Sequence, residues 1–471
     1  MRTTLLALVL LLLTACATNP ATGRSEFNIV SEQQELAMGK EAHEQVLAEY
    51  GVYDEKPELN AMVDRIGHEI AASSPRPNLP WTFTLLDTPM VNAMALPGGY
   101  IYVTRGILER MNSEDELAGV IGHEVAHVAA RHSAQSISRA TLAQVGLAAA
   151  MVAAGYENTE RYGWLAAVGV GLLFTKYSRS QETQADVLGT DYMSGAGWNP
   201  YGSANMLQGL QRLQGGRTAG IERYFMDHPD PAKRVEDVKR EIAKLDAVDP
   251  SREERPMQRD SFVRLLDGAL TGNNTTATII KGNTVYNRTY GLVAQSPRGW
   301  KAMTEAGSLF AFVPENGQEV IYAQELSEDE LRGHDTPREA VQAQLEKLGL
   351  TRVDSDRVNT FTIDRWKGTS NGTSYTAATT QQNAGDGAVA LLHLVQGTSS
   401  SSALDEVVRT LEVNSPKAAK VKPPRLRVRA AKKGETWDSL ARGEDAAELA
   451  HLNGFDYPSE VPAGLMVKIR E

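Results

Sequence analysis

The stretch from His123 to His127 reads His-Glu-Val-Ala-His, and its residue types and spacing indicate metal chemistry. Residues four apart share one face of an α-helix, so both imidazoles could bind a single Zn²⁺ ion. Glu124 lies between them, where its carboxylate could hold and deprotonate a water molecule. The spacing therefore predicts the core of a zinc hydrolase site.

The residues around this motif predict the helix that it needs. Asn112 and Ser113 supply a helix cap, and three acids follow at 114–116, as is typical of a helix N-terminus. Apolar residues then recur at helical spacing as far as Val128. No proline interrupts the pattern. We therefore expect one helix to carry both histidines.

A third zinc ligand is expected, because catalytic zinc sites usually have three protein ligands and a water molecule. The segment 178–186 reads as a second helix, in which Glu182 and Asp186 are four apart and share a face. In the functional interpretation, Glu182 binds zinc and Asp186 accepts a hydrogen bond from a ligand imidazole. In the alternative interpretation, both are solvent-facing acids of an ordinary helix.

Several ordered motifs between about residues 25 and 245 carry a family resemblance. They are His123 to His127 with Arg131-His132, the segment 178–186, and Asn92-Ala93 through Pro97-Gly98-Gly99 to Thr104-Arg105-Gly106. Together they resemble the HtpX and CAAX prenyl protease type of gluzincin zinc metallopeptidase, most closely its periplasmic BepA-like and LoiP-like branch. The resemblance implies that His123, His127 and Glu182 bind one Zn²⁺ per chain, that Glu124 is the general base, and that Asp186 supports a ligand. The chain lacks the long spanning helices of the membrane-embedded members, so prenylated substrates are not implied.

His228 begins the segment His-Pro-Asp-Pro, which matches a His-Pro motif of the same family, and Arg234 lies just beyond it. Three roles remain open for His228: a hydrogen bond to the tetrahedral oxyanion, zinc binding that displaces water and holds the enzyme latent, or packing beside Pro229. Arg234 is expected beside the ligands, with Asp186.

The chain has 471 residues, which suggests about three domains, and the expected fold class is α+β. We expect a mainly helical zincin-type peptidase domain at 31–250 with a small edge sheet. Within it, the pattern predicts helices at 31–50 and 56–73, a strand at 81–86, and a hairpin around Pro97-Gly98-Gly99. The hairpin strand either binds an extended peptide or is purely structural.

The second half of the chain has a different pattern. Strands are expected at 291–296, 309–314, 319–324 and 389–395, and helices at 337–348 and 403–411. These elements predict a small α+β domain at 260–414 without a catalytic signature, suited to positioning substrate or binding a partner. A basic, solvated linker is expected to follow at 415–425, because eight Lys or Arg and no acid occur from Ser415 to Lys433.

The last segment, 426–471, resembles a LysM repeat, a small β-α-α-β module that binds glycans containing N-acetylglucosamine. The resemblance is carried by Gly434-Glu435-Thr436-Trp437, by Leu452-Asn453-Gly454 and by the closing segment 462–469. It implies peptidoglycan as a partner. Arg427 and Arg429 depart from the usual first strand, and a non-binding structural remnant is the alternative.

The N-terminal sequence predicts that the protein is located in the bacterial cell envelope. Residues 1–15 have a charged start and a short apolar run, and Leu13-Thr14-Ala15-Cys16 resembles a lipoprotein signal. The resemblance implies that Cys16, the only cysteine, is lipidated and followed by a tether at 16–30, and that Ala17 favours the outer membrane, facing the periplasm. The alternative is a plain secretory signal with an incidental cysteine. Two apolar stretches, 145–154 and 164–174, form either a buried helical hairpin or one that faces a membrane or partner.

These observations favour a zinc-dependent endopeptidase of the bacterial cell envelope. The resemblance implies that it degrades unfolded or misassembled envelope proteins. The alternative is a peptidoglycan-associated scaffold or chaperone with a latent metal site. Glu124 favours the enzyme, since a purely structural zinc site needs no base. The net charge of −11 argues against nucleic acid as a partner.

Overall fold

A computed structural model describes residues 16–153, 177–213, 224–225, 228, 231–252, 257–304, 308–317, 319–370, 373–385, 387–397 and 402–471. The chain divides into two compact units. Unit 1 comprises the residues up to Ala269 together with Leu426–Glu471, and unit 2 comprises Leu270–Arg425. The expected signal segment 1–15 lies outside the described residues.

Unit 1 begins with a short hairpin and two helices. Strands β1 (Cys16–Thr18) and β2 (Ser25–Phe27) pair antiparallel, and α2 (Glu32–Tyr50) and α3 (Pro57–Ala72) follow. Ser31 caps α2 through a capping box with Gln34. Both helices occupy the ranges that the sequence predicts.

A three-stranded sheet follows, in the order β3 (Thr82–Leu86), β5 (Tyr100–Thr104) and β4 (Ala93–Leu96). The β4–β5 pair is antiparallel and forms the predicted hairpin, joined by the short 3-10 turn Pro97–Gly99. Gly98 takes φ 82°, a left-handed conformation that glycine adopts without strain. Among the described residues, β4 is an edge strand that pairs only with β5.

The helical part of unit 1 is built around α5, which contains the His-Glu-Val-Ala-His motif. Its described helices are α4 (Arg105–Arg110), α5 (Glu114–Ala129), α6 (His132–Ala153), α7 (Arg179–Gly195), α8 (Tyr201–Leu213), α10 (Pro231–Val248) and α11 (Arg259–Leu265). The 3-10 turn Pro250–Arg252 lies between α10 and α11. Helix α5 packs against α3, α7, α8 and the sheet, so 14 of its 16 residues are buried. Ser113 caps it, as the sequence predicts.

Two glycines allow α5 and α7 to approach closely. A Cβ atom on Gly189 of α7 would lie 2.6 Å from the carbonyl carbon of Gly122 and 2.7 Å from the backbone nitrogen of His123. A Cβ on Gly122 would lie 2.8 Å from the Gly189 carbonyl oxygen. Real side chains cannot occupy such positions, so this close crossing of the helices requires glycine at both.

The apolar stretches at 145–154 and 164–174 are only partly described. Residues 145–153 form the last part of α6, and the second stretch lies outside the described residues. Within the described ranges, no helix combines the length and the hydropathy required to cross a membrane.

Unit 2 is rich in strands. A three-stranded sheet contains β6 (Thr278–Lys281), β7 (Thr284–Asn287) and β8 (Leu292–Gln295). A seven-stranded antiparallel sheet has the order β12-β13-β14-β15-β11-β10-β9. Its strands are β9 (Trp300–Met303), β10 (Phe310–Pro314), β11 (Glu319–Leu326), β12 (Leu350–Val358), β13 (Phe361–Ser370), β14 (Thr373–Ala384) and β15 (Gly387–Gln396). The long strands β12 to β14 are not predicted by the sequence analysis.

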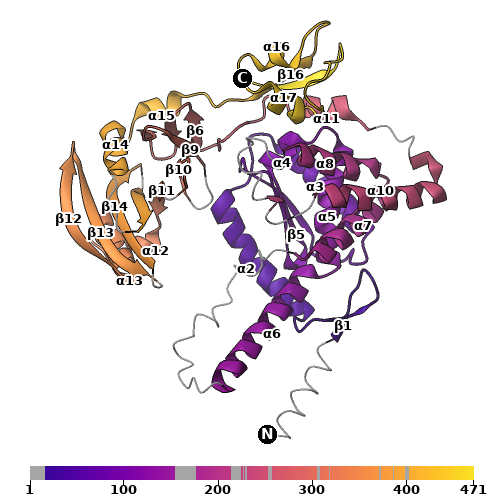
Figure 1. Cartoon of the computed structure of the whole chain (residues 1–471), viewed down its shortest axis with the longest axis horizontal. Helices are drawn as coiled ribbons and strands as arrows, with labels where there is room; N and C mark the ends of the chain where they lie inside the picture. Colours follow the sequence, from indigo (N-terminus) through magenta and orange to yellow (C-terminus); the bar gives the residue numbers. More distant parts are fainter. Residues whose placement is uncertain are drawn as a thin grey trace. The chain divides into compact units, whose positions relative to one another are not determined.

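Helices cover both faces of the larger sheet (Figure 1). One core, which includes Phe310, Phe361 and Leu391, packs against α14 (Ala403–Thr410). On the other face, Trp366 and Ala390 pack against α13 (Pro337–Lys347), which follows the short α12 (Glu328–Leu331). A short helix, α15 (Pro416–Lys420), lies within the segment expected to be a solvated linker.

The C-terminal segment has the element order β16 (Leu426–Ala430), α16 (Trp437–Ala441), α17 (Ala446–Leu452) and β17 (Met466–Arg470), with the two strands paired antiparallel. It belongs to unit 1 and packs against the end of α4. The Lys468 ammonium is fully buried and donates hydrogen bonds to the carbonyl oxygens of Glu109 and Met111. Arg470 forms a salt bridge with Glu109. The module is thus an ordered part of unit 1.

Candidate metal centre

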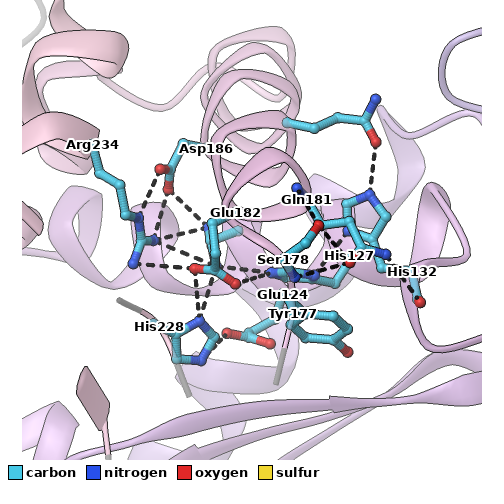
Figure 2. Close-up of polar contacts among 12 residues, drawn as sticks. Glu124, His127, His132, Tyr177, Ser178, Gln181, Glu182, Asp186, His228 and Arg234 are labelled. Carbon is cyan, nitrogen blue, oxygen red and sulfur yellow. Dashed lines mark hydrogen bonds and ion pairs between the residues drawn. The ribbon is translucent and has the colours of Figure 1, made fainter. Parts of the chain in front are cut away.

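Four buried side chains converge at the centre of unit 1 (Figure 2). His123 and His127 come from α5, Glu182 comes from the first turn of α7, and His228 lies between α8 and α10. One potential ligand atom from each residue lies within 4.8 Å of the others. The Nε2 atoms of His123 and His127 are 3.0 Å apart, and His228 Nδ1 is 3.1 Å from Glu182 Oε2.

Local structure explains how these side chains meet. His123 and His127 share one face of α5 because they are four residues apart. Ser178 and Gln181 form a capping box that fixes the first turn of α7, where Glu182 lies. The close crossing at Gly122 and Gly189 brings this turn against α5, so the Glu182 carboxylate lies 3.4–3.6 Å from the two imidazoles.

Asp186 and Arg234 support His123 from behind. Asp186 Oδ1 lies 2.9 Å from His123 Nδ1, so it can accept a hydrogen bond from this nitrogen in the neutral tautomer that is protonated on Nδ1. The Arg234 guanidinium donates two hydrogen bonds of 2.8 Å to the Asp186 carboxylate and lies 3.2 Å from Glu182 Oε2. All three of these groups are almost completely buried. This arrangement fixes the orientation of the His123 ring.

Glu124 lies beside the cluster, and one of its two carboxylate oxygens has no hydrogen-bond partner among the described residues. This atom, Oε2, is buried, and the Oε1 atom is 3.9 Å from His228 Nε2. Burial raises the pKa of Glu124 above its usual value of 4.5, and the nearby Glu182 raises it further, whereas His228, His123 and Arg234 oppose the shift. A carboxylate in this environment has increased affinity for protons, which suits a general base.

Close pairing with charged neighbours shifts the pKa values of three other groups of the site. Burial disfavours the charged form of Glu182, but His228 and Arg234 outweigh it and hold its pKa well below 4.5. Arg234 lowers the pKa of Asp186 in the same way, against the effect of burial. Burial also disfavours the cation of His228, yet Glu182 and Glu124 outweigh it and raise the pKa of His228 to about 9.

The donor set fits a zinc ion. When His123 carries its proton on Nδ1, facing Asp186, its Nε2 presents a lone pair to the Nε2 of His127, only 3.0 Å away. Glu182 Oε1 points into the same space and has no hydrogen-bond partner among the described residues. Lone pairs at such distances repel unless a proton or a metal cation lies between them. Imidazole nitrogens and a carboxylate are the ligands that zinc takes in catalytic sites.

The structure brings together most of the residues that the sequence singles out. His123, Glu124, His127, Glu182 and His228 surround one point, and Asp186 and Arg234 lie directly behind them. The interpretation of Glu182 and Asp186 as solvent-facing acids is excluded, since they are only 1% and 4% exposed. Cys16 lies in strand β1.

Sequence reasoning missed the residues that contact His127. The Tyr177 ring stacks on its imidazole at a centroid distance of 3.8 Å. His132 Nδ1 lies 2.9 Å from His127 Nδ1. The only sequence signal for His132 is its place in the Arg131-His132 motif. Tyr177 lies next to the cap of α7, a position that indicates no function by itself.

Residues 57–242 match the model of Peptidase family M48, and this range contains every residue of the metal centre. The chain is 33% identical over 220 residues to the mitochondrial metalloendopeptidase OMA1 of Schizosaccharomyces pombe, covering 46% of this chain and 63% of that protein. It is 28% identical over 231 residues to the beta-barrel assembly-enhancing protease of Yersinia pestis, covering 47% and 46%. It is 32% identical over 149 residues to the metalloprotease LoiP of Escherichia coli K12, covering 32% and 58%.

The aligned segments span less than two thirds of the length of each of these relatives. The residues that match the family model, 57–242, all lie in unit 1.

Proposed function

We propose that this protein is a zinc-dependent endopeptidase of the bacterial cell envelope that cleaves unfolded or misassembled envelope proteins. The observation that carries the proposal is the buried cluster of His123, His127, Glu182 and His228, with the Glu124 carboxylate beside it, whose Oε2 atom has no hydrogen-bond partner in the described part of the chain. The match of residues 57–242 to Peptidase family M48 and the names of the relatives support a peptidase.

His123, His127 and Glu182 would hold the zinc ion, which when bound acts as a Lewis acid toward the scissile carbonyl and lowers the pKa of water. Glu124 takes a proton from the attacking water on its Oε2 atom, which has no hydrogen-bond partner among the described residues. It then returns this proton to the leaving amine nitrogen as the peptide C–N bond breaks. Asp186 keeps the proton of His123 on Nδ1, which leaves Nε2 free to bind the metal.

Strand β4 provides a place for an extended substrate. It is an edge strand of the sheet in the described part of the chain, and it packs against α5, which carries Glu124. An extended peptide can add to such an edge through main-chain hydrogen bonds, which recognise backbone rather than sequence. This mode of binding suits substrates that are unfolded, because only an unfolded segment can be extended over several residues.

The position of His228 favours a resting enzyme that is latent, that is, unable to cleave until this side chain moves. Its Nδ1 atom lies 3.4 Å from His123 Nε2 and 3.1 Å from Glu182 Oε2, where it can bind the metal as a fourth ligand. In this role it would fill the position that catalytic zinc sites keep for water, and it would have to move before cleavage. The second candidate function, a scaffold or chaperone with a latent metal site, rests on the same observation.

We further propose that Cys16 is lipidated, that the protein faces the periplasm from the outer membrane, and that residues 426–471 bind peptidoglycan glycan. The support for glycan binding is the β-α-α-β order of the module and an exposed aromatic ring, Tyr457, which is 40% exposed. A Cys16→Ser protein should lose detergent partitioning. A Tyr457→Ala protein should sediment less with purified peptidoglycan than the unaltered chain; equal sedimentation would exclude this ring from a glycan site.

Metal removal and a substrate trap test the main proposal. A chelator should abolish cleavage of an unfolded protein, and added zinc should restore it. The Glu124→Gln variant, expressed in the envelope and cross-linked, should retain uncleaved envelope proteins. The scaffold function would be favoured instead if the wild-type protein and the His228→Ala variant both bound zinc and neither cleaved an unfolded protein.

A further inference from the structure

His132 lies directly behind His127, on the side away from the metal cluster. It is fully buried at the first position of α6. Its Nδ1 atom is 2.9 Å from His127 Nδ1, and its Nε2 atom is 2.7 Å from Gln184 Oε1 (Figure 2 shows the two imidazoles). The three side chains therefore form an unbroken hydrogen-bonded row that ends at the metal cluster.

The backbone is shaped to bring His132 to this position. In a continuous helix, a residue five positions after His127 would lie about 140° around the axis and could not face it. Helix α5 instead ends at Ala129, and Arg131 adopts the left-handed conformation with φ 56°. The Arg131 guanidinium is held by the Glu35 carboxylate at 2.8 Å and by the carbonyl oxygen of Val30 at 2.8 Å. These contacts stabilise a conformation that non-glycine residues rarely adopt.

Metal binding determines where the protons lie in this row. His127 Nε2 faces the other ligands, 3.0 Å from His123 Nε2 and 3.4 Å from Glu182 Oε1, so it must be unprotonated to bind zinc. The proton of the neutral His127 ring then resides on Nδ1 and is donated to His132 Nδ1. His132 must in turn carry its own proton on Nε2, which it donates to Gln184 Oε1.

We propose that His132 and Gln184 form a neutral relay that positions His127 for zinc and fixes its tautomer. The carbonyl oxygen of Gln184 sets the direction of the relay, since it can only accept a hydrogen bond. If the row ran in the opposite direction, His127 would carry its proton on Nε2 and could not bind the metal. His132 and Gln184 are thus positioning residues.

The relay differs from the support of the other histidine ligand. His123 is held by a carboxylate, Asp186, which is itself paired with Arg234. His127 is held by uncharged groups, and the Tyr177 ring stacks on its imidazole with an interplanar angle of 21°. The Tyr177 hydroxyl lies 2.9 Å from the hydroxyl of Ser133, which follows His132 in the chain. The His127 ring is therefore fixed both at its edge and at its face.

This inference rests on the proposed zinc site, and variants of His132 test it in the full chain. His132→Phe keeps an aromatic ring but removes the acceptor, whereas His132→Asn keeps an acceptor close to the position of Nδ1. Zinc dissociation constants are measured by competition with a chromophoric chelator, and Co²⁺-loaded proteins provide visible absorption spectra. His393→Phe is the matched control, because His393 is also buried and pairs with a side chain, Glu319, but lies in unit 2.

We expect His132→Phe to weaken zinc binding by roughly 10–100-fold, the effect typical of losing a partner of a metal ligand, and to shift the Co²⁺ absorption bands. His132→Asn should recover most of the affinity, and Gln184→Met should weaken binding less than His132→Phe. His393→Phe should leave binding unchanged.

The relay would be overturned if His132→Phe bound zinc with wild-type affinity. It would also be overturned if the Phe and Asn variants lost equal zinc affinity, because an equal loss indicates that His132 acts through packing alone. A wild-type protein that binds no zinc would instead overturn the proposed function.

Discussion

The close crossing of α5 and α7 predicts that one methyl group on Gly189 will disturb the metal centre. A Cβ at this position would lie 2.6 Å from the carbonyl carbon of Gly122, whereas ordinary contact begins at 3.4 Å. The difference requires the helices to separate by about 0.8 Å. The opposing atoms are backbone, and α5 is packed on its other sides by α3, α8 and the sheet, so we expect α7 to move relative to α5.

Glu182 lies on α7, two turns before Gly189, and moves with the helix. Overpacking of this kind costs about 1–3 kcal/mol of stability. A misplacement of about 1 Å in a catalytic site can reduce the rate roughly 100-fold. We therefore expect Gly189→Ala to lower kcat/KM by about 30–100-fold and to weaken zinc binding. The assays are cleavage of an unfolded fluorogenic protein and chelator competition.

Gly209→Ala is the matched control. Gly209 lies in helix α8, and a Cβ at this position would meet nothing within 4 Å. The substitution should leave activity unchanged and raise stability by up to about 1 kcal/mol, because alanine is the better helix former. If Gly189→Ala bound zinc and cleaved substrate like the wild type, the glycine contact would not position Glu182, and the reasoning would be refuted.

Three further perturbations follow from the site and its surroundings. Asp186→Asn should destabilise the protein by roughly 3 kcal/mol in denaturant titrations, because it leaves the buried Arg234 with one carboxylate partner instead of two; unchanged stability would contradict this. His228 has a pKa of about 9 without metal, so its proton must leave before it binds zinc, and affinity should rise from pH 7 to 9 more steeply than in His228→Ala, by up to about tenfold per pH unit; parallel slopes would show that His228 is not a ligand. Arg470→Met should speed amide hydrogen exchange at the end of α4, because it removes a partner of the buried Glu109; unchanged exchange would mean that this contact does not hold the C-terminal module.

The sequence predicts the core of the metal centre because its geometry is local. Two histidines four apart on a helix must share a face, and the same rule applies to Glu182 and Asp186. The contact between the two histidines and Glu182 is tertiary, and only the family resemblance predicts it from the sequence. His132 escapes prediction because the left-handed conformation of Arg131 has no signature in the sequence.

The fold of unit 2 and the placement of the C-terminal module are harder to predict. Strand β12 is exposed along nearly its whole length, so it lacks the alternation of apolar and polar residues that marks a half-buried strand. In β17, the charge of Lys468 suggests an outward position. The structure buries it instead, because two backbone carbonyls of the α4 end receive its hydrogen bonds. Such partners are visible only in the folded chain.

The central claim is that Glu124 acts as the base beside a zinc ion, and comparison of residues 17–471 with their Glu124→Gln variant tests it most directly. Glutamine has nearly the same shape as glutamate but cannot accept the proton. Zinc content and cleavage of an unfolded protein are measured on both. We predict about one zinc ion in each protein and cleavage by the wild type alone. Cleavage by Glu124→Gln, or a wild-type protein without zinc, would contradict the account.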